Sequence, residues 1–240
     1  MKVTRSIATT STALAAATAA AVGLSVAPAR AADTTVVGGQ PASSSYIVQL
    51  EFTQNGGTYG CTGEAISAQW ILTARHCTEG DTSMTVYYSN STWDRGPGHP
   101  ADAVYNSPNG DVGLVHLADP APLTSYAPLA TSYTPRRGDR GTIYGYGARA
   151  NMRPSDQLYK ASVTVLGTSR DAYWGPAIHV RGVDGASNHG DSGGPLFVNG
   201  RVVGVCSTGD TSDPGSDINA GSNYANLTAS RSWIRSRTGV

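Results

Sequence analysis

Residues 190–195 (GDSGGP) place a serine, Ser192, in a stretch rich in glycine. Glycine lacks a Cβ, so the backbone can adopt conformations that other residues avoid and can bring its amides close to a ligand. A nucleophilic hydroxyl beside backbone amides that stabilise an oxyanion requires such a backbone. The same sequence could also form an ordinary glycine-rich turn. The nucleophile hypothesis therefore depends on finding a base and a carboxylate elsewhere in the chain.

Two other segments offer that base and that carboxylate. The apolar run that begins at Ile71 ends in His76, next to Cys77. Of the five histidines, only His76 stands beside a cysteine that can form a disulfide. Asp111 directly precedes an apolar run at residues 112–117. By itself a histidine is more often structural, and an aspartate at a strand end is more often a turn residue.

The composition favours an extracellular protein rich in strands and turns. The chain has 240 residues and no net charge, and it contains 29 glycines and 12 tyrosines. The sequence has no cluster of Lys or Arg, which argues against a nucleic-acid partner. Once a leader is removed, about 205 residues remain, enough for one large all-β domain or two small ones.

The first 31 residues have the pattern of a secretory signal peptide. A basic start is followed by an alanine-rich apolar run from Ile7 to about Val26. Residues 29–31 (ARA) then offer the small side chains that a signal peptidase reads. The alternative, a transmembrane helix, fits less well because Thr and Ser interrupt the run and no stop-transfer charges follow. We therefore predict a secreted protein that is not bound to a membrane after residues 1–31 are removed.

Short apolar runs broken by Gly, Pro, Asn and Ser fill most of the remaining chain. Runs of β-branched and aromatic residues at this spacing predict an all-β sandwich or barrel. The runs lie at residues 46–50, 70–73, 84–88, 112–117, 142–144, 161–166, 196–198 and 202–206. A proline-rich segment at 119–137 is predicted to connect two halves of the domain. One helix is predicted near the C-terminus, with Thr228 as its cap, Trp233 and Ile234 on its apolar face, and its end before Gly239.

The three cysteines fit an oxidising compartment. Cys61 and Cys77 are close in sequence and can pair after export. Closing a loop of about 15 residues would stabilise the fold by about 3 kcal/mol in the chain-entropy model. Cys206 lies inside an apolar run, so we expect a buried side chain in a strand rather than a reactive thiol.

These segments together resemble the trypsin/chymotrypsin family of serine endopeptidases. Four blocks match the family in order, and two others match more loosely. The four are residues 36–39 (VVGG), 72–77 (LTARHC), 111–117 (DVGLVHL) and 190–195, and the looser two are 145–147 (GYG) and 207–209 (STG). The resemblance covers nearly the whole chain after the leader.

The resemblance implies a fold of two six-stranded antiparallel β-barrels, with the active site between them and a short C-terminal helix. The N-terminal barrel is expected at about 36–118 and the linker at about 119–137. The C-terminal barrel and the helix are expected at about 138–240.

The resemblance also implies a role for each candidate residue. His76 corresponds to the general base, Asp111 to the carboxylate that orients it, and Ser192 to the nucleophile of an acyl-enzyme mechanism. The backbone amides of Gly190 and Ser192 would form the oxyanion hole. Ser207 matches the family serine that donates a hydrogen bond to the buried carboxylate.

A further implication concerns activation. In the family, cleavage before the residue that corresponds to Val36 frees an α-amine, which enters the protein and pairs with the aspartate that corresponds to Asp191. Each charge makes burial of the other tolerable. Residues 32–35 are therefore predicted to be a short propeptide. The alternative is that these residues remain as a tail after imprecise signal cleavage.

Specificity is predicted from the residue six positions before the nucleophile. This is Ala186, a neutral residue that offers no counter-charge to Lys or Arg, so cleavage is expected after apolar or aromatic P1 residues. Ser207 and Gly209 are expected to line the same pocket, and Gly209 would leave room for a large side chain. Asp213 or Asp217 could instead reach the pocket and give a preference for Lys and Arg.

The chain departs from the family in ways that bear on its partners. Thr208 replaces the tryptophan that is usual beside the pocket, and Asn188 replaces a cysteine near the nucleophile. The interval from His76 to Asp111 is short, so the loop that binds calcium in some members is expected to be missing. No metal and no cofactor are expected. The expected partners are protein or peptide substrates and possible protein inhibitors, and the protein is expected to be a monomer.

Two other functions compete with the endopeptidase hypothesis. A catalytically silent binding homologue is disfavoured because all three residues of the constellation are present. An esterase could use the same acyl-transfer chemistry, but the motif at Val36 favours the endopeptidase.

Overall fold

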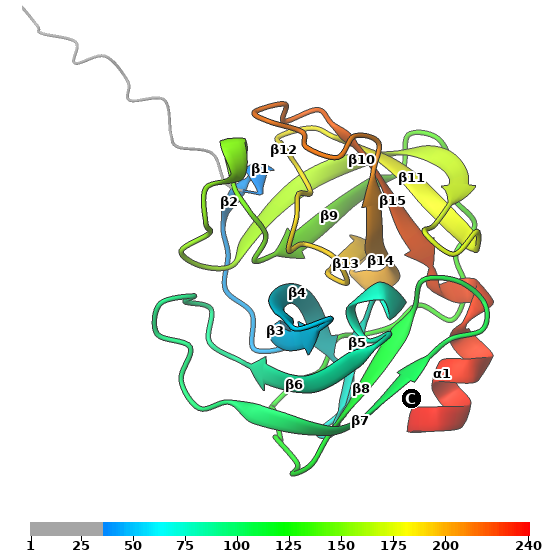
Figure 1. The fold of residues 1–240 in the computed structure, drawn as a ribbon. Coiled ribbons are helices and arrows are strands. Elements are labelled where there is room, and N and C mark those ends of the chain that lie inside the picture. Colours follow the sequence, from blue (N-terminus) through cyan, green and yellow to red (C-terminus); the bar gives the residue numbers. More distant parts are fainter. Residues whose placement is uncertain (1–35) are drawn as a thin grey trace, which may run out of the picture. The chain divides into compact units, whose positions relative to one another are not determined.

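The computed structural model of this chain describes residues 36–240 (Figure 1). The predicted signal peptide at 1–31 and the predicted propeptide at 32–35 lie outside the described residues. Within those described, no helix is both long and apolar enough to cross a membrane.

The first barrel is a closed antiparallel sheet with the strand order β3-β4-β5-β8-β7-β6. Its strands are β3 (Ile47–Gln54), β4 (Gly57–Ala65), β5 (Trp70–Thr73), β6 (Asp81–Tyr87), β7 (His99–Asn106) and β8 (Gly113–Leu117). Side chains such as Leu50, Phe52 and Val115 fill its interior and are almost fully buried. Apolar side chains on one face of each strand are what close such a sheet around a core.

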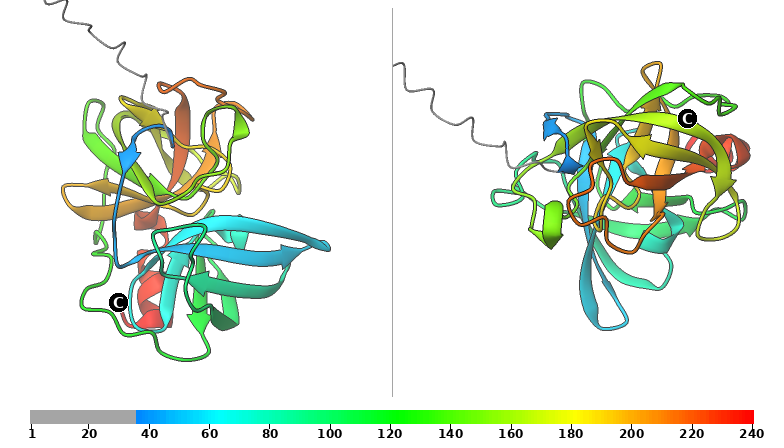
Figure 2. Two further views of the ribbon diagram at one scale, coloured as in Figure 1. Left: turned by 90° about the vertical axis from the view of Figure 1, so that its left-hand side faces the viewer. Right: turned by 90° about the horizontal axis from the view of Figure 1, so that it is seen from above.

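The second barrel has the strand order β11-β15-β14-β13-β9-β10, and β10 pairs with β11 to close it. Its strands are β9 (Arg140–Gly145), β10 (Tyr159–Arg170), β11 (Pro176–Gly182), β13 (Pro195–Val198), β14 (Arg201–Gly209) and β15 (Gly221–Asn226). Buried residues alternate with partly exposed ones along β10, as in a strand with one face toward a core. The two six-stranded antiparallel barrels predicted from the sequence are therefore confirmed (Figures 1 and 2).

The first residues of the described chain pair with the second barrel rather than with the first. β1 (Val37–Gly38) pairs with β12 (Gly185–Ala186), and β2 (Gln40–Pro41) adds to the edge of β10. The predicted boundary, which assigned residues 36–118 to the N-terminal barrel, differs here. The strands of the first barrel span only residues 47–117, because the preceding segment finds its backbone partners in the other half of the chain.

The connection and the terminal helix join the two barrels. β8 ends at Leu117 and β9 begins at Arg140, so the segment between them lies close to the predicted linker. The helix α1 (Arg231–Thr238) ends at Gly239, which has a left-handed conformation as expected for a helix C-terminus. Ile234 is fully buried among apolar residues of both barrels.

The predicted cap of this helix is wrong. Thr228 lies in the 3-10 turn η3 (Leu227–Ala229), and α1 begins only after Ser230. The amide of Thr228 donates to Asn226 Oδ1 at 3.0 Å, and its hydroxyl donates to the carbonyl of Tyr133 at 3.3 Å. The side chain of Thr228 therefore ties the turn to the connection between the barrels.

Candidate active site

His76 lies in the 3-10 turn η1 (Arg75–Cys77), which follows β5. Its backbone amide donates to Asp111 Oδ1 at 2.9 Å, and its ring Nδ1 lies 2.7 Å from Asp111 Oδ2. Because a carboxylate only accepts, Nδ1 carries the hydrogen and Nε2 of a neutral ring is left as an acceptor. The imidazole is about one-third exposed. The arrangement therefore presents a basic nitrogen at a partly open surface.

Asp111 lies two residues before β8 and is fully buried. A buried carboxylate is tolerated only when it is paired or hydrogen-bonded. In addition to the two contacts from His76, Ser207 Oγ donates to Asp111 Oδ2 at 2.6 Å. Ser207 belongs to β14 of the second barrel, so this hydrogen bond joins the two barrels at the carboxylate.

Ser192 lies in the tight turn that precedes β13. Its carbonyl accepts from the amide of Thr62 at 2.9 Å, and the next amide, of Gly193, donates to the carbonyl of Cys206 at 2.8 Å. Gly193 has a φ of +78°, and a Cβ there would lie only 2.0 Å from Thr73 Oγ1. Gly190 has a φ of +93°. The turn therefore needs glycine at these two positions, as the sequence of the hexapeptide predicts.

A cavity of about 410 Å³ brings these residues together. Both His76 and Ser192 line it, together with Ser207 and Gly209 of β14. The other lining residues are Ser187, Asn188, His189, Cys206, Thr208, Asp210, Thr211, Ser212 and Pro214. Four predicted site residues, His76 from the first barrel and Ser192, Ser207 and Gly209 from the second, thus lie at one cavity.

Not all of the predicted pocket residues line this cavity. Ala186 is almost fully buried in β12, where it pairs with Val37, and it is not among the lining residues. Asp213 and Asp217 line a different cavity. The acidic residue that does line the first cavity is Asp210, which was not predicted from the sequence as a pocket residue.

The wall of the cavity is polar but largely uncharged. Ser187 Oγ and Ser222 Oγ form a buried hydrogen bond of 2.6 Å. The carboxylate of Asp210 is already held by His179 Nε2 at 2.9 Å and by Asn223 Nδ2 at 3.3 Å. The charge of Asp210 is therefore partly satisfied within the protein.

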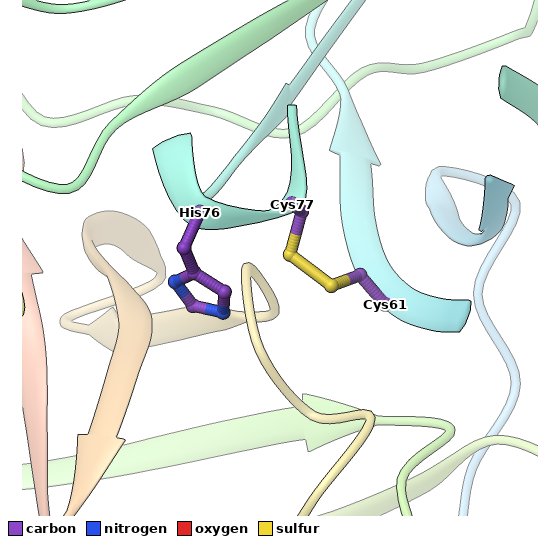
Figure 3. A group of neighbouring side chains, drawn as sticks. All are labelled: Cys61, His76 and Cys77. Atoms are coloured by element: carbon purple, nitrogen blue, oxygen red, sulfur yellow. A yellow bond between two sulfur atoms is a disulfide. The ribbon is translucent and has the colours of Figure 1, made fainter. Parts of the chain in front are cut away.

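Cys61 and Cys77 form the predicted disulfide (Figure 3). Their sulfurs and a ring nitrogen of His76 lie within 4.8 Å of one another, a spacing that could suggest a metal site. Metals bind cysteine as a thiolate, and these sulfurs are bonded to each other. The disulfide instead anchors η1 to β4. Cys206, the free cysteine, is buried in β14 as expected, and burial raises its pKa to about 12.

Asp191, next to Ser192, has a buried carboxylate. It accepts hydrogen bonds from the amides of Gly147 and Asn188, both at 2.8 Å. Burial raises its pKa to about 7, although the two amide hydrogen bonds act in the opposite direction. Val36 is buried in the core of the same barrel with a φ of 45°, which is unusual for a β-branched residue.

One residue of this network was missed by the sequence analysis. Asp171 is buried, and its Oδ2 accepts from the amide of Asp111 at 2.9 Å. Its Oδ1 accepts from the amides of Tyr173 and Gly175 at 2.9 and 2.8 Å. An aspartate that opens a tight turn ended by glycine is a recognisable local signal. Its contact with Asp111 spans 60 residues and has no local signal.

Comparison with known proteins agrees with this geometry. A family model described as Trypsin matches residues 36–234. Serine protease 1 of Drosophila melanogaster is 30% identical over 222 residues, which cover 81% of each chain. Trypsin-1 of Salmo salar is 28% identical, covering 85% of this chain and 91% of its own. An uncharacterised peptidase of Corynebacterium glutamicum is 30% identical, covering 81% of this chain and 69% of its own.

The fold is shared with solved structures as well. The structure of neuropsin, described as a serine protease expressed in the limbic system of mouse brain, matches with a TM-score of 0.63 at 22% identity. The match covers 82% of this chain and 96% of neuropsin. The family match over almost all described residues and the similarity to named serine proteases lead to one conclusion: the chain belongs to the trypsin family and is a serine endopeptidase.

Proposed function

We propose that the chain is a secreted endopeptidase that hydrolyses peptide bonds through Ser192, His76 and Asp111. The observation that carries the proposal is the 2.7 Å contact between His76 Nδ1 and the buried Asp111, at a cavity that Ser192 also lines. A serine hydroxyl is a weak nucleophile at neutral pH and needs an adjacent base. Nε2 of a neutral His76 with its hydrogen on Nδ1 supplies that base.

In the proposed reaction, Ser192 Oγ attacks the carbonyl carbon of the scissile bond while His76 Nε2 takes its proton. The amides of Gly190 and Ser192 stabilise the oxyanion of the tetrahedral intermediate. His76 then gives the proton to the leaving amine, and an acyl-enzyme remains on Ser192. Water, activated by His76 in the same way, releases the acid product and regenerates the serine.

Asp111 is proposed to hold His76 in the reactive tautomer and to stabilise the imidazolium that forms during attack. Ser207 supports this role, because its hydroxyl satisfies the same carboxylate oxygen from the opposite barrel. Two hydrogen bonds on one oxygen fix the carboxylate without neutralising its charge.

The proposed P1 side chain is apolar or aromatic. The support is that Ser187 and Cys206 at the cavity carry no formal charge, and the hydroxyl of Ser187 is already hydrogen-bonded to Ser222, so a buried Lys or Arg side chain would lack a counter-charge there. Cleavage after Lys or Arg is the second candidate, because Asp210 lines the same cavity. A peptide library varied at P1 decides between them: a dominant signal at Lys or Arg would reject the apolar preference.

Activation is proposed to follow removal of residues 1–31 and then of 32–35. The new α-ammonium of Val36 would pair with Asp191, whose buried carboxylate has amide donors but gains much more from a cation. The φ of Val36 supports this step, because cutting the preceding peptide bond removes that backbone constraint. N-terminal sequencing of active secreted protein tests the proposal, and an active species that begins at Ala32 would contradict it.

Labelling by a fluorophosphonate tests the chemistry at Ser192. Protein that begins at Val36 is expected to be labelled covalently, whereas the Ser192→Ala variant is not. The same variant is expected to have a kcat lower by on the order of 10⁶-fold, since the three residues act as a unit. Absence of labelling in the unmodified protein would indicate a silent binding homologue. Turnover of esters without turnover of peptides would indicate an esterase.

A further inference from the structure

A second cavity, of about 660 Å³, adjoins the cavity that contains His76 and Ser192. His189 lines both cavities, and Gly190 and Cys61 line the second one. The two cavities therefore meet at the turn that precedes Ser192. The second cavity is called the disulfide-side groove below.

The disulfide-side groove gathers most of the large apolar side chains that are exposed in the described part of the chain. Trp93 is 82% exposed, Tyr59 is 50% exposed and Met152 is 47% exposed, and all three line the groove. The other two such residues among 36–240, Trp174 and Val183, lie outside it. Contiguous exposed apolar side chains indicate a binding surface, whereas single ones are ordinary.

The wall of the groove is built by two loops, one from each barrel. These are the loop between β6 and β7 and the loop between β9 and β10 (Figure 1). The first contains Trp93 and the second contains Met152. Thr92 joins them: its hydroxyl donates to the carbonyl of Ser155 at 2.6 Å, and its amide donates to the carbonyl of Asp156 at 3.0 Å. The wall is therefore held in place before any ligand arrives.

The remaining surfaces of the groove are also fixed by contacts within the protein. Tyr59, on β4, stacks on Phe52 with ring centroids 6.0 Å apart. Met152 has a φ of 59°, a costly conformation for its residue type, and the preceding amide of Asn151 donates to the carbonyl of Gly215 at 3.0 Å. Strain of this kind persists where the surrounding structure imposes it, and it clusters at binding sites.

We propose that Trp93, Tyr59 and Met152 of the disulfide-side groove make the enzyme select large apolar side chains in the part of a polypeptide substrate that follows the scissile bond. The proposal rests on the proposed function, which places P1 in the first cavity and the scissile carbonyl at the amides of Gly190 and Ser192. Because a polypeptide is continuous, the residues after the scissile bond extend from these two amides on the side opposite to P1. That side is the groove lined by Gly190 and Cys61.

The test compares three substrates that share the same residues up to P1. The first is a p-nitroanilide, which has no amino acid after the scissile bond and so cannot enter the groove. The second is a quenched fluorescent peptide with Leu and Phe at P1′ to P3′, and the third has Ser and Gly there. We expect kcat/KM for the apolar peptide to exceed that for the polar peptide by about tenfold or more, the size of effect that apolar pockets give.

Two variants assign the selectivity to the groove. Trp93→Ala removes the most exposed of the three apolar side chains, and Met152→Asn introduces a polar residue that tolerates a positive φ. In each variant we expect the ratio of kcat/KM for the apolar peptide to that for the anilide to fall by about tenfold. Trp174→Ala is the matched control, since Trp174 is 81% exposed but outside the groove, and its ratio is expected to stay at the wild-type value.

The possible outcomes separate the two proposals. Equal cleavage of the apolar and polar peptides by an enzyme that hydrolyses the anilide would overturn the groove assignment and leave the proposed function intact. The groove assignment would also be overturned if Trp93→Ala and Met152→Asn each lowered kcat/KM for the anilide as much as for the apolar peptide. An enzyme beginning at Val36 that cleaves none of the three substrates would contradict the proposed function and the groove assignment together.

Discussion

The carboxylate of Asp171 accepts a hydrogen bond from the backbone amide of Asp111 at 2.9 Å, and both side chains are buried. Asp111 thus has its side chain held by His76 and Ser207 and its backbone held by a second carboxylate. The other oxygen of Asp171 accepts two amides of its own turn, at Tyr173 and Gly175. Asp171 therefore links a turn of the second barrel to the carboxylate that we propose orients His76.

Asp171→Asn is expected to lower kcat by about 10- to 100-fold with little change in KM. Both oxygens of Asp171 accept from backbone amides, whereas asparagine has only one oxygen, so its NH₂ group must face an amide donor and a hydrogen bond is lost. Loss of a buried hydrogen bond of this type costs about 1–3 kcal/mol. Steady-state kinetics with a short peptide substrate measures the effect. Asp81→Asn is the control, because Asp81 is only partly buried and accepts an amide hydrogen bond from Ser83, which asparagine can also accept.

That control is expected to keep the wild-type kcat. An Asp171→Asn enzyme with a normal kcat would show that the hydrogen bond to the Asp111 amide does not position the carboxylate. A change confined to KM would instead assign Asp171 to substrate binding.

Asp191 is expected to make the pH dependence of stability different before and after cleavage at Val36. In uncleaved protein the pKa of Asp191 is about 7, above the usual value for aspartate, so the folded state keeps a proton that the unfolded state loses. Stability is then fully present below about pH 4 and falls as the pH rises toward 7. In protein that begins at Val36, a paired ammonium would lower this pKa and remove the loss.

Thermal denaturation at pH 4 to 8 of both forms measures this difference. Asp191→Asn is expected to make the two forms respond alike, because its side chain does not titrate. Identical pH profiles for the two forms with Asp191 intact would contradict the proposed pairing with Val36.

Glu64 is expected to destabilise the first barrel at neutral pH. It is fully buried in β4, and neither carboxyl oxygen has a hydrogen-bond partner among the described residues. Burial raises its pKa well above 4.5, so the unfolded state ionises first and stability falls as the pH rises from about 4.5 to the raised pKa. The slope is about 1.4 kcal/mol per pH unit while only the unfolded state is ionised.

Glu64→Met, which fills similar space without a charge, is expected to raise the Tm at pH 8 by more than it does at pH 4. Each kcal/mol corresponds to about 2–4 °C for a domain of this size. Calorimetry at the two pH values measures the difference. An equal Tm change at both would show that Glu64 does not titrate in this way.

Cys206 is expected to be unreactive in the folded protein. Its thiol is buried, burial raises its pKa to about 12, and the thiolate is the reactive form. A disulfide reagent at pH 8 should therefore detect no thiol in native protein and one after denaturation without a reductant. One equivalent of rapid labelling in the native state would show that the adjoining cavity gives reagents access to the sulfur.

The sequence predicts much of the fold because several strands are short apolar runs, such as β5 and the first part of β3. It does not predict β4, which is rich in glycine and threonine and becomes a strand through its ladder with β3. The same applies to β7, which contains no fully buried residue and begins with His, Pro and Asp among its first four positions. Barrel closure depends on partners that local periodicity cannot specify.

The candidate site divides in a similar way. His76, Asp111 and Ser192 stand in local motifs and could be named from the sequence, and their proposed roles remain predictions. Asp171 acts across 60 residues, so no local pattern reveals its contact. Ala186 was expected at the pocket, but β12 turns it toward β1, a pairing that depends on a segment about 150 residues away. The groove walls likewise arise from loops of different barrels.

The pairing of β1 and β2 with the second barrel has a consequence for folding. The start of the described chain is held by the second barrel, while the helix α1 near its end lies beside the first (Figure 1). Arg237 of α1 lies over the ring of Tyr105, and Ser230, just before α1, shares a hydrogen bond with Ser107. Each end of the described chain thus packs on the barrel that is farther from it in sequence. Neither half can complete its own surface in isolation, so the two are expected to unfold in one cooperative transition, and the cleft between them persists only while both are intact.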